Sequence, residues 1–453
     1  MTAPTIYPSA AGLGMFRAAD DQGVWPYRGQ VAAVGIGHSP TLRRWDGDPQ
    51  KSIGAWSLLA VRRAIEDAGV APDQVDGLVI VDSTTTGAFW PEGEPVPADF
   101  LAAFQNTSDP FDGLIKLSPE WMVKNLPELT GLKFVMVAPG CMSHAVAAAM
   151  EAVGRGMGEV VLSVKGWHNV PGRYGQRGAA ARDTVSGPGK FSALAGPPVY
   201  GTAQQFQRYL YKYNKTHDMM APFVVNSRSN GLKMPEGYWY QHRNSPLTTD
   251  EYLQSRWVAE PANLYDNDIP IHTAAAYLFT TPERARDMRQ PPVYVLGHAT
   301  GGRVVGNSLL GFKPRSVIAG LEETEEQARR TAARLYDSTG ISSSDVDFEN
   351  AYDGFSLFHV FWIEGFTFFG IQRGEALDFF SSEDISINGP TPISPSGGNI
   401  GSGRTRFWLW TDTIQQLQGR AGERQVKKDA HIGVCGGFMP IQSSFAALSK
   451  DPV

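Results

Sequence analysis

Residues 133–156 read KFVMVAPGCMSHAVAAAMEAVGRG, and this stretch decides the fold. A short apolar run, typical of a buried strand, ends at Pro139-Gly140, and a helix rich in small residues follows. Cys141 stands at the entrance of that helix. The next segment, GEVVLSVKG at 158–166, predicts another strand. The stretch therefore predicts a strand–helix–strand piece of an α/β protein.

The residues before this stretch supply the same kinds of element. VAAVGIG at 31–37 is typical of a strand in a buried sheet. Residues 52–69 carry apolar side chains at helical spacing, with Gly69 as a stop. A turn and a second buried strand are expected within VAPDQVDGLVIVDS, residues 70–83. Together with residues 133–166, these segments predict a β-α-β-α-β unit.

A second copy of this unit is predicted in the C-terminal part of the chain. VYVLGHATG at 293–301 predicts a strand, a helix ends at Gly340, and residues 341–354 supply a turn and a strand. Further on, SGGNIGSG leads into the helix RTRFWLWTDTIQQLQGRAG and the strand DAHIGVCGG. This glycine-rich entrance takes the place that the Cys141 turn has in the first copy.

The two copies also match at a constant offset. Gly69-Val70 corresponds to Gly340-Ile341, and Val75-Asp76 corresponds to Val346-Asp347. Because α/β proteins reuse helix–turn–strand phrases, chance is the alternative explanation. Two matched segments in the same order favour a duplication.

The duplication divides the chain into four parts. Residues 1–30 form an N-terminal extension, and residues 31–170 form the first half, with a proline-rich excursion at 85–125. Residues 171–290 are a cap and loop region that returns to the first half, and 291–453 form the second half. The cap begins with a loop expected to be flexible, GRYGQRGAAARDTVSGPGK, followed by a helix-like AQQFQRYLYKYNKTH. An insertion between two halves is where a substrate-covering cap would lie.

The composition is that of an ordinary globular enzyme. Of the 453 residues, 42% are apolar and 19% are charged, and the net charge of −6 comes without a basic block. This argues against nucleic acid as the main partner. Two cysteines cannot form a disulfide framework or a four-thiolate zinc site, and free thiols suit a reducing cytoplasm. With no signal peptide, no apolar run near about 18 residues and no paired metal-ligand motif, we expect a cytoplasmic protein without a metal.

Cys141 is the first candidate for chemistry. A thiol at a helix N-terminus feels unpaired N–H groups that lower its pKa and favour the thiolate. The alternative is a buried, inert cysteine. His144 shares the same helical face and could be its base, or it could only pack there. His272 and His298 lie near predicted strand ends and could reach a pocket, although no spacing distinguishes them.

Three further candidates lie at strand ends of the second copy. Tyr352 and Asp353 are placed for acid–base work, because open α/β sheets hold ligands at the carboxyl ends of strands. An unperturbed tyrosine, with a pKa of about 10, is a poor base unless its phenolate is stabilised. The alternatives are a core tyrosine and a capping aspartate. Cys435 could transfer a proton to or from a carbon acid, or it could simply be buried.

The stretch GGNIGSGRT, at 397–405, is almost a phosphate-binding loop, with Arg-Thr where Lys-Thr or Lys-Ser is expected. Such a loop follows a buried strand, whereas residues 383–396 (EDISINGPTPISPS) are polar and rich in proline. We therefore reject a nucleotide site and interpret the stretch as the second-copy helix entrance.

The cysteine-opened helix, the glycine-rich entrance and the Cys-Gly-Gly strand end resemble the thiolase superfamily, from about residue 31 to 448. NAYDGFSLF, SPSGGNIGSGR, QLQGRAGERQV and TTPERARDMRQPPVYVLG look like the lipid-transfer-protein branch related to sterol-carrier-protein thiolases. The resemblance implies duplicated βαβαβ units in five layers (αβαβα), a homodimer, and an acyl-CoA substrate with no tightly bound cofactor. It also implies a heterotetramer with a small zinc-ribbon/OB-fold protein of the DUF35 type.

The resemblance assigns roles residue by residue. Cys141 matches the thiolase nucleophile, and Cys435 matches the C-terminal acid/base cysteine. Tyr352 stands where the sterol-carrier thiolases have a histidine; in the aldolases of the branch, a tyrosine at this place is implicated in proton transfer. Thiolases have Gly-His-Pro where this chain reads Gly403-Arg404-Thr405, so the usual activator of the nucleophile is missing. The resemblance further implies that the two glycine-rich turns bind the CoA thioester, through Gly397, Gly398, Gly403, Arg404, Gly436 and Gly437.

Three functions remain open. The first is retro-aldol cleavage of a bulky, steroid-like β-hydroxyacyl-CoA, with Tyr352 as acid/base and Asp353 beside it. The second is a thiolase or acyltransferase that acts on a β-ketoacyl-CoA through an acyl-enzyme on Cys141. The third is a non-catalytic CoA- or lipid-binding subunit of a complex.

Overall fold

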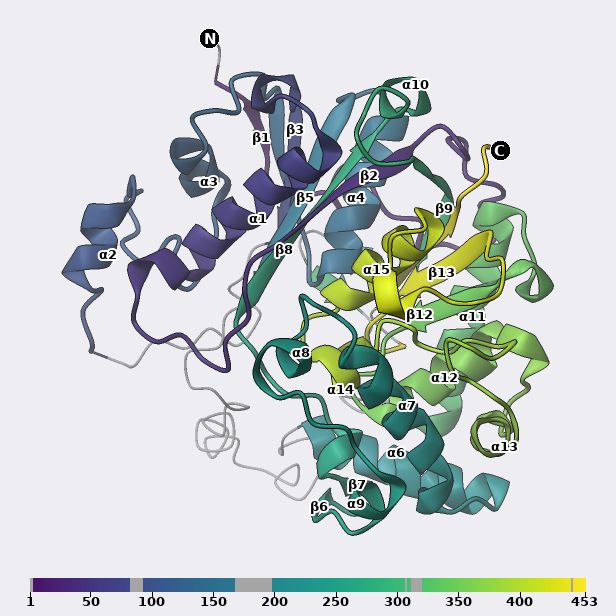
Figure 1. Ribbon diagram of the computed structural model, residues 1–453. Helices are drawn as coiled ribbons and strands as arrows, with labels where there is room; N and C mark the ends of the chain where they lie inside the picture. The colour runs from purple at the N-terminus through teal and green to yellow at the C-terminus, as the bar shows by residue number, and fades with distance from the viewer. Residues whose placement is uncertain (1–2, 82–92, 168–197, 306–307, 311–319, 441–442) are drawn as a thin grey trace.

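The computed structural model describes residues 3–81, 93–167, 198–305, 308–310, 320–440 and 443–453. Among these residues, ten strands form one central sheet (Figure 1). In the order in which they lie side by side, they are β1 (Thr5–Tyr7), β4 (Phe134–Ala138), β3 (Gly77–Val81), β5 (Val160–Trp167), β8 (Thr273–Thr280), β2 (Ala32–His38), β9 (Val293–Thr300), β14 (Ser444–Ser449), β13 (Ile432–Gly436) and β12 (Phe348–Ala351).

The sheet consists of two halves with the same internal order. β4, β3, β5, β8 and β2 form the first half, and β9, β14, β13 and β12 form the second. β4, β3 and β5 run parallel, as do β12 and β13, whereas β8 and β14 run antiparallel to their neighbours. The halves meet where β2 pairs with β9 through only two residue pairs, Ala32 with Tyr294 and Ala33 with Val293.

Helices cover the sheet and also lie between its halves. α4 (Met142–Gly154) contacts strands of both halves, and so does α15 (Phe407–Leu417); the side chains of both helices are almost entirely buried. The Trp410 indole of α15 donates to the Ser143 hydroxyl of α4 at 3.1 Å. α1 (Ile53–Ala68) packs on the first half alone, across the face of its strands in Figure 1, and α11 (Leu321–Thr339) packs on the second half. The layers therefore alternate as helix, sheet, helix, sheet, helix.

Other helices extend this body. They are α2 (Ala98–Ala103), α3 (Pro119–Asn125), α6 (Pro198–Tyr213), α7 (Ala221–Gly231), α8 (Tyr238–His242), α9 (Thr249–Leu253), α10 (Pro282–Ala285), α12 (Ser356–Phe366), α13 (Ala376–Ser382) and α14 (Gly398–Ser402). Two small ribbons pair β6 (Trp257–Ala259) with β7 (Ala262–Asn263) and β10 (Arg303–Val305) with β11 (Ser308–Leu310). None of the described helices is long and apolar enough to cross a membrane.

The alternating direction of side chains along each strand explains why the layers form. In β3, Leu78 and Ile80 point into the core beneath α1, whereas Val79 and Val81 point into the core that holds α4. Successive side chains of a strand face opposite sides of the sheet, so an uninterrupted apolar run is suited to a sheet that is covered on both faces. The apolar run read from the sequence is therefore a strand covered on both faces.

The duplicated turns fold in the same way. α1 ends at Gly69 and α11 ends at Gly340, with φ angles of 71° and 68° that favour glycine. Asp76 then accepts the backbone N–H groups of Glu159 and Val160 at 3.0 and 2.9 Å. At the matching position, Asp347 accepts those of His431 and Ile432 at 2.7 and 3.0 Å. The two copies thus share a side chain that anchors the start of a neighbouring strand.

The expected excursion and cap contain more regular structure than the sequence indicated. The stretch 85–125 includes α2 and α3, although its residues 85–92 lie outside the described part. The loop expected to be flexible, 172–190, also lies outside the described residues. The helix expected after it is α6, and the return to the first half is β8.

The N-terminal extension is attached to the core through one strand and a few buried side chains. β1 pairs in parallel with β4, and Trp25 is 1% exposed. The Trp25 indole donates to Glu151 of α4 at 2.8 Å, and its backbone N–H donates to the carbonyl of Ser338 at 2.7 Å. Burial opposes ionisation of Glu151, yet bonds from His298, Trp25 and Arg155 lower the pKa of its carboxyl to about 2.

We predict that Asp76→Ala and Asp347→Ala each lower the free energy of unfolding by about 1–3 kcal/mol. Each substitution leaves backbone N–H groups without their acceptor. Denaturant titration would measure the loss, with the exposed Asp73→Ala as a control that changes stability by less than about 0.5 kcal/mol. A pronounced loss of stability from one substitution and none from the other would contradict the equivalence of the two turns.

Candidate active site

Cys141 lies where β4 ends and α4 begins. It is the N-cap residue of α4, follows Gly140 (φ 74°) and is 2% exposed. Its Sγ lies 3.1 Å from Nδ1 of His144, which is one helical turn further on. The His144 ring packs edge-on against Phe16, and its Nε2 has no hydrogen-bond partner among the described residues. The sequence pair therefore forms a thiol–imidazole contact in the structure.

The electrostatic surroundings favour the Cys141 thiolate. Burial alone would raise the pKa of the thiol, but His144, then Arg406 and Lys165, outweigh it and lower the pKa to about 6. Lys165 extends from β5, and its Nζ donates to the carbonyl of Gly140 at 3.3 Å. At neutral pH this cysteine is therefore mostly ionised.

The glycine-rich entrance of the second copy faces this turn with a different set of side chains. Gly398 opens α14 with φ 58°, and a Cβ there would lie 2.0 Å from the Asp353 carboxylate. Asp353 accepts the backbone N–H groups of Asn399 and Ile400 at 2.6 and 3.2 Å. Burial raises the pKa of Asp353 to about 6, although His359 and these N–H groups oppose the rise. Asp353 therefore caps α14.

Asn399 holds the rest of the turn. Its side-chain oxygen accepts the backbone N–H groups of Thr405 and Arg406 at 3.3 and 2.9 Å. Its amide group donates to Asp268 at 3.3 Å. Because Arg406 has a φ of 70°, which is uncommon for a residue other than glycine, this side-chain bond stabilises an otherwise unfavourable backbone.

Arg406 is a buried cation enclosed by aromatic rings. Its guanidinium carbon lies 3.9 Å from the ring centre of Phe438, 5.0 Å from Tyr352 and 5.1 Å from Trp167. Arg404 and Lys165 also approach the Trp167 ring, at 4.7 and 5.3 Å. Three cationic groups therefore surround one indole at distances at which cation–π attraction is effective.

Tyr352 is 3% exposed and lies at the end of β12. Burial is the main reason that its pKa rises to about 12, with Asp268 adding to the rise and hydrogen bonding and charge from Arg406 opposing it. The side chain is therefore a protonated phenol at neutral pH. The stabilised phenolate that a tyrosine base requires is therefore not formed, because desolvation outweighs the guanidinium.

Asp268 lies on the segment between the short helical turn Leu264–Asp266 and β8. It is 4% exposed. Burial raises the pKa of its carboxyl to about 7. The positive charges of Arg404 and Arg406 oppose this rise, and the negative charge of Asp353 adds to it. A carboxyl that titrates near neutral pH is suited to proton transfer.

Three of the predicted residues lie elsewhere. Cys435 points toward α15, where Thr413 is hydrogen-bonded to it, and burial strongly raises its pKa. The turn after Cys435 does reach the site, because the carbonyl of Gly436 accepts the backbone N–H of Tyr352 and Gly437 lies close to the Tyr352 Cβ. His272 bonds to the carbonyl of Lys51 at 2.6 Å, and its ring packs at a tilt of 43° against Trp56. His298 belongs to the Glu151 cluster at the other end of α4.

The sequence reasoning missed three residues of the site, Arg406, Asp268 and Lys165. Arg406 follows the predicted Arg404 by two positions, so the Arg-x-Arg pattern was a usable signal. Lys165, a charge within an apolar strand, was another. For Asp268 the sequence carries no such signal, since a tertiary contact places it. Among the described residues, no cluster of His, Cys, Asp and Glu could hold a metal ion.

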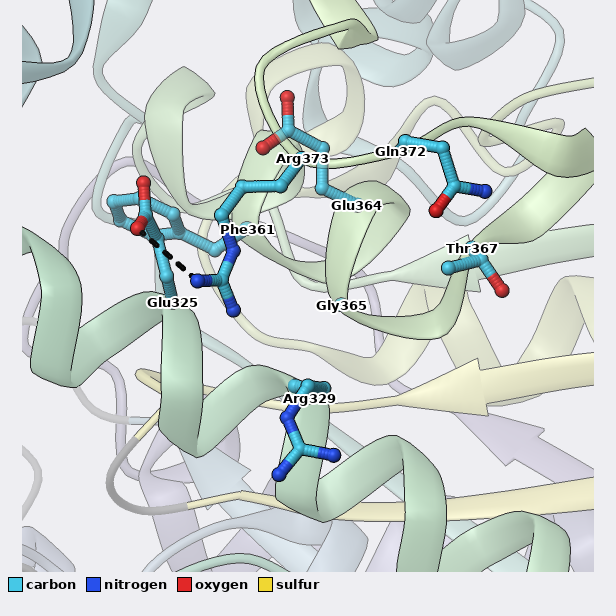
Figure 2. A pocket seen from close by; sticks show the side chains of 8 residues that line it. All are labelled: Glu325, Arg329, Phe361, Glu364, Gly365, Thr367, Gln372 and Arg373. Carbon is cyan, nitrogen blue, oxygen red and sulfur yellow. Dashed lines mark ion pairs between the residues drawn. The ribbon is translucent and has the colours of Figure 1, made fainter. Parts of the chain in front are cut away.

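A pocket of about 230 Å³ lies apart from this site, at the junction of α11 and α12 (Figure 2). It is lined by Glu325, Arg329, Phe361, Glu364, Gly365, Thr367, Gln372 and Arg373. The guanidinium of Arg373 lies 3.8 Å from the Glu325 carboxylate, and Tyr209 of α6 donates to Glu364. No residue of the Cys141–Tyr352 cluster lines this pocket.

Comparisons with known proteins agree with the fold. A family model described as thiolase C-terminal domain-like matches residues 315–447. A steroid side-chain-cleaving aldolase of Thermomonospora curvata is 27% identical over 381 residues, 82% of this chain and 86% of the aldolase. A 17-hydroxy-3-oxo-4-pregnene-20-carboxyl-CoA lyase of Mycobacterium tuberculosis is 26% identical over 82% of this chain and 87% of the lyase. A solved structure described as an Ltp2-ChsH2(DUF35) aldolase superposes with a TM-score of 0.70 at 24% identity, over 93% of this chain and 98% of that one.

The chain therefore has the thiolase fold, as expected, and its similarity to thiolase-like proteins confirms the resemblance seen in the sequence.

We predict that the thiolate absorbance of Cys141 appears with a midpoint near pH 6 in the native protein. His144→Gln should move the midpoint above the ordinary thiol range of about 8–9, because burial then acts without the neighbouring imidazole. Cys435→Ser is the matched control and should leave the transition unchanged. A wild-type curve without a transition below the ordinary range would contradict the thiol–imidazole assignment.

Proposed function

We propose that this thiolase-like enzyme cleaves a carbon–carbon bond of a CoA thioester by a retro-aldol reaction, with a bulky, steroid-like β-hydroxyacyl-CoA as substrate. The observation that carries the proposal is the buried contact between Arg406 and Tyr352 at the end of β12. Similarity to a steroid side-chain-cleaving aldolase and to a pregnene-carboxyl-CoA lyase supports the reaction class and the substrate class.

A retro-aldol reaction requires three events. The β-hydroxyl loses a proton, the bond between Cα and Cβ breaks, and the electron pair forms an enolate on the thioester. Tyr352 would act as acid/base through its protonated form, giving a proton or a hydrogen bond to the developing negative charge. Arg406 supplies fixed positive charge in a water-poor site, where it is most effective. No acyl-enzyme is required, so the reaction tolerates the absence of the Gly-His-Pro histidine.

A second function is favoured by one specific observation, the 3.1 Å contact between Cys141 and His144. An ionised thiol beside an imidazole is the arrangement used to form an acyl-enzyme. His144 would then take the part of the missing histidine, from within α4 itself, in a thiolase or acyltransferase reaction. A binding subunit without activity is the third outcome that the experiment below distinguishes.

The assembly is also part of the proposal. We propose a homodimer that binds a small DUF35-type protein, giving a heterotetramer in the cytoplasm. The support is the superposition on the Ltp2-ChsH2(DUF35) aldolase, which spans nearly the whole of both chains. Both cysteines of this chain are free, as expected for a reducing compartment.

Tyr352→Phe should lower kcat/KM for cleavage of a steroid-like β-hydroxyacyl-CoA by about 10²–10⁴-fold, because it removes the proton-transferring hydroxyl and keeps the ring. The exposed Tyr211→Phe is the matched control and should retain activity. Steady-state release of the carbonyl product measures both variants. Unchanged cleavage by Tyr352→Phe would refute the role of the tyrosine.

Cys141→Ala separates the two catalytic functions. It should leave retro-aldol cleavage within a few-fold of wild type, since the thiol makes no bond to the substrate in that reaction. Loss of activity, together with an acyl adduct on wild-type Cys141 in intact-protein mass spectrometry, would establish the acyltransferase instead. CoA binding without activity toward either substrate class would favour the non-catalytic subunit.

Co-expression with a DUF35-type protein tests the assembly. We expect the two chains to co-purify, with a mass in light scattering that corresponds to two copies of each. The matched control is this chain expressed alone, which should elute as a dimer. Failure to co-purify with such a partner encoded beside this chain would contradict the proposal.

A further inference from the structure

We propose that Asp268 is the general base of the site and removes the β-hydroxyl proton, while Tyr352 remains the proton donor. This inference rests on the proposed retro-aldol function and divides its acid and base roles between two side chains.

The backbone around Asp268 is attached to both catalytic loops. The Asp268 N–H donates to the carbonyl of Gly354 at 3.1 Å, and Asn267 forms an antiparallel bridge with Phe355. On its other side, the N–H of Arg404 donates to the carbonyl of Ile269 at 2.9 Å, next to a parallel bridge between Pro270 and Arg404. The segment therefore lies between the Tyr352 loop and the arginine loop and fixes Asp268 relative to both.

The charged groups that face Asp268 come from each of these loops. Arg404 and Arg406, on the glycine-rich turn, act to lower the pKa of Asp268. Asp353, on the Tyr352 loop, acts to raise it. Asp268 in turn acts on Tyr352, whose pKa it raises. Asn399 of α14 donates to its carboxylate. Asp268 is thus in electrostatic contact with the acid that the reaction needs and with the cations that hold the substrate's developing charge.

The neighbouring carboxylates are used for structure. The two oxygens of Asp353 accept the first N–H groups of α14. Asp266 accepts four hydrogen bonds, from the Asn263 N–H, the His217 imidazole and the hydroxyls of Tyr252 and Ser356, at 2.7–2.8 Å. The Asp268 carboxylate instead faces Arg404, Arg406 and Tyr352, and burial raises its pKa to about 7.

The proposed step balances without another reactant. The Asp268 carboxylate takes the proton of the β-hydroxyl, the C–O bond becomes C=O, and the Cα–Cβ bond breaks with its electrons on the thioester enolate. Tyr352 then protonates Cα, which gives the shortened acyl-CoA and a tyrosinate beside Arg406. The proton held by Asp268 returns to the tyrosinate, and both side chains recover their starting states.

The test is the pH profile of cleavage in Asp268→Asn. Wild-type kcat/KM should fall tenfold per unit of pH below about pH 7, because the base is protonated there. In Asp268→Asn, kcat/KM should fall by about 10²–10⁴-fold, and the acid limb should disappear. Asp266→Asn, two residues away, is the matched control: it should lower Tm, keep kcat/KM within a few-fold and keep the limb.

A second variant serves if Asp268→Asn does not fold, and a second measurement reports on Asp268 independently of activity. If Asp268→Asn does not fold, Asp268→Glu should retain the limb with a reduced kcat. Carbon NMR of labelled aspartate should show a carboxyl resonance titrating near neutral pH in the wild type that is absent from the Asp268 variants.

Each outcome decides a different point. A wild type that cleaves no β-hydroxyacyl-CoA refutes the function, and the base role with it. If the wild type is active and the pH profile of Asp268→Asn is unaltered, the base role of Asp268 is refuted but the retro-aldol function is not. Equal pH effects from the Asp266 and Asp268 variants would show a structural role.

Discussion

The guanidinium of Arg406, held among Phe438, Tyr352 and Trp167, is the interaction on which the site depends. A buried cation costs several kcal/mol unless nearby groups compensate it. Here the compensation comes from aromatic faces and from two ionisable partners, Cys141 as a thiolate and Asp268 as a carboxylate. The charge of Arg406 helps to lower the pKa of Cys141. For Asp268 and Tyr352 it only partly offsets the rise in pKa that burial causes. Removing this one charge would change the ionisation of every reactive side chain nearby.

The two halves share a framework but carry different chemistry. In each half an aspartate, Asp76 or Asp347, accepts two consecutive backbone N–H groups of a neighbouring strand. The helix entrances have diverged. In the first half, Cys141 contacts His144 of the helix that it caps. In the second half, Asp353 caps the helix and Arg406 turns inward. A duplicated scaffold thus supplies two loops that can vary independently while their spacing stays fixed.

Local patterns explain what the sequence predicted. β2, α1, β3, β4 and α4 form close to their expected bounds, because apolar periodicity and glycine stops act within a few residues. The Cys141–His144 contact follows from helical spacing. Asp268 was not predictable, since bridges to Phe355 and Arg404, distant in sequence, place it. The burial of Cys435 against α15 likewise depends on packing between elements, which a strand-end motif does not encode.

The N-terminal segment has a consequence for the order in which the chain folds. Trp25 is held by Glu151 and Ser338, and the N–H of Gly29 donates to the carbonyl of Val295. These contacts can therefore form only after Val295 and Ser338 have been synthesised. Contacts so distant in sequence are slow to form, because a long loop must close first. During synthesis, the apolar surface around Trp25 remains exposed to chaperones and to other nascent chains for longer than any surface inside the first half alone.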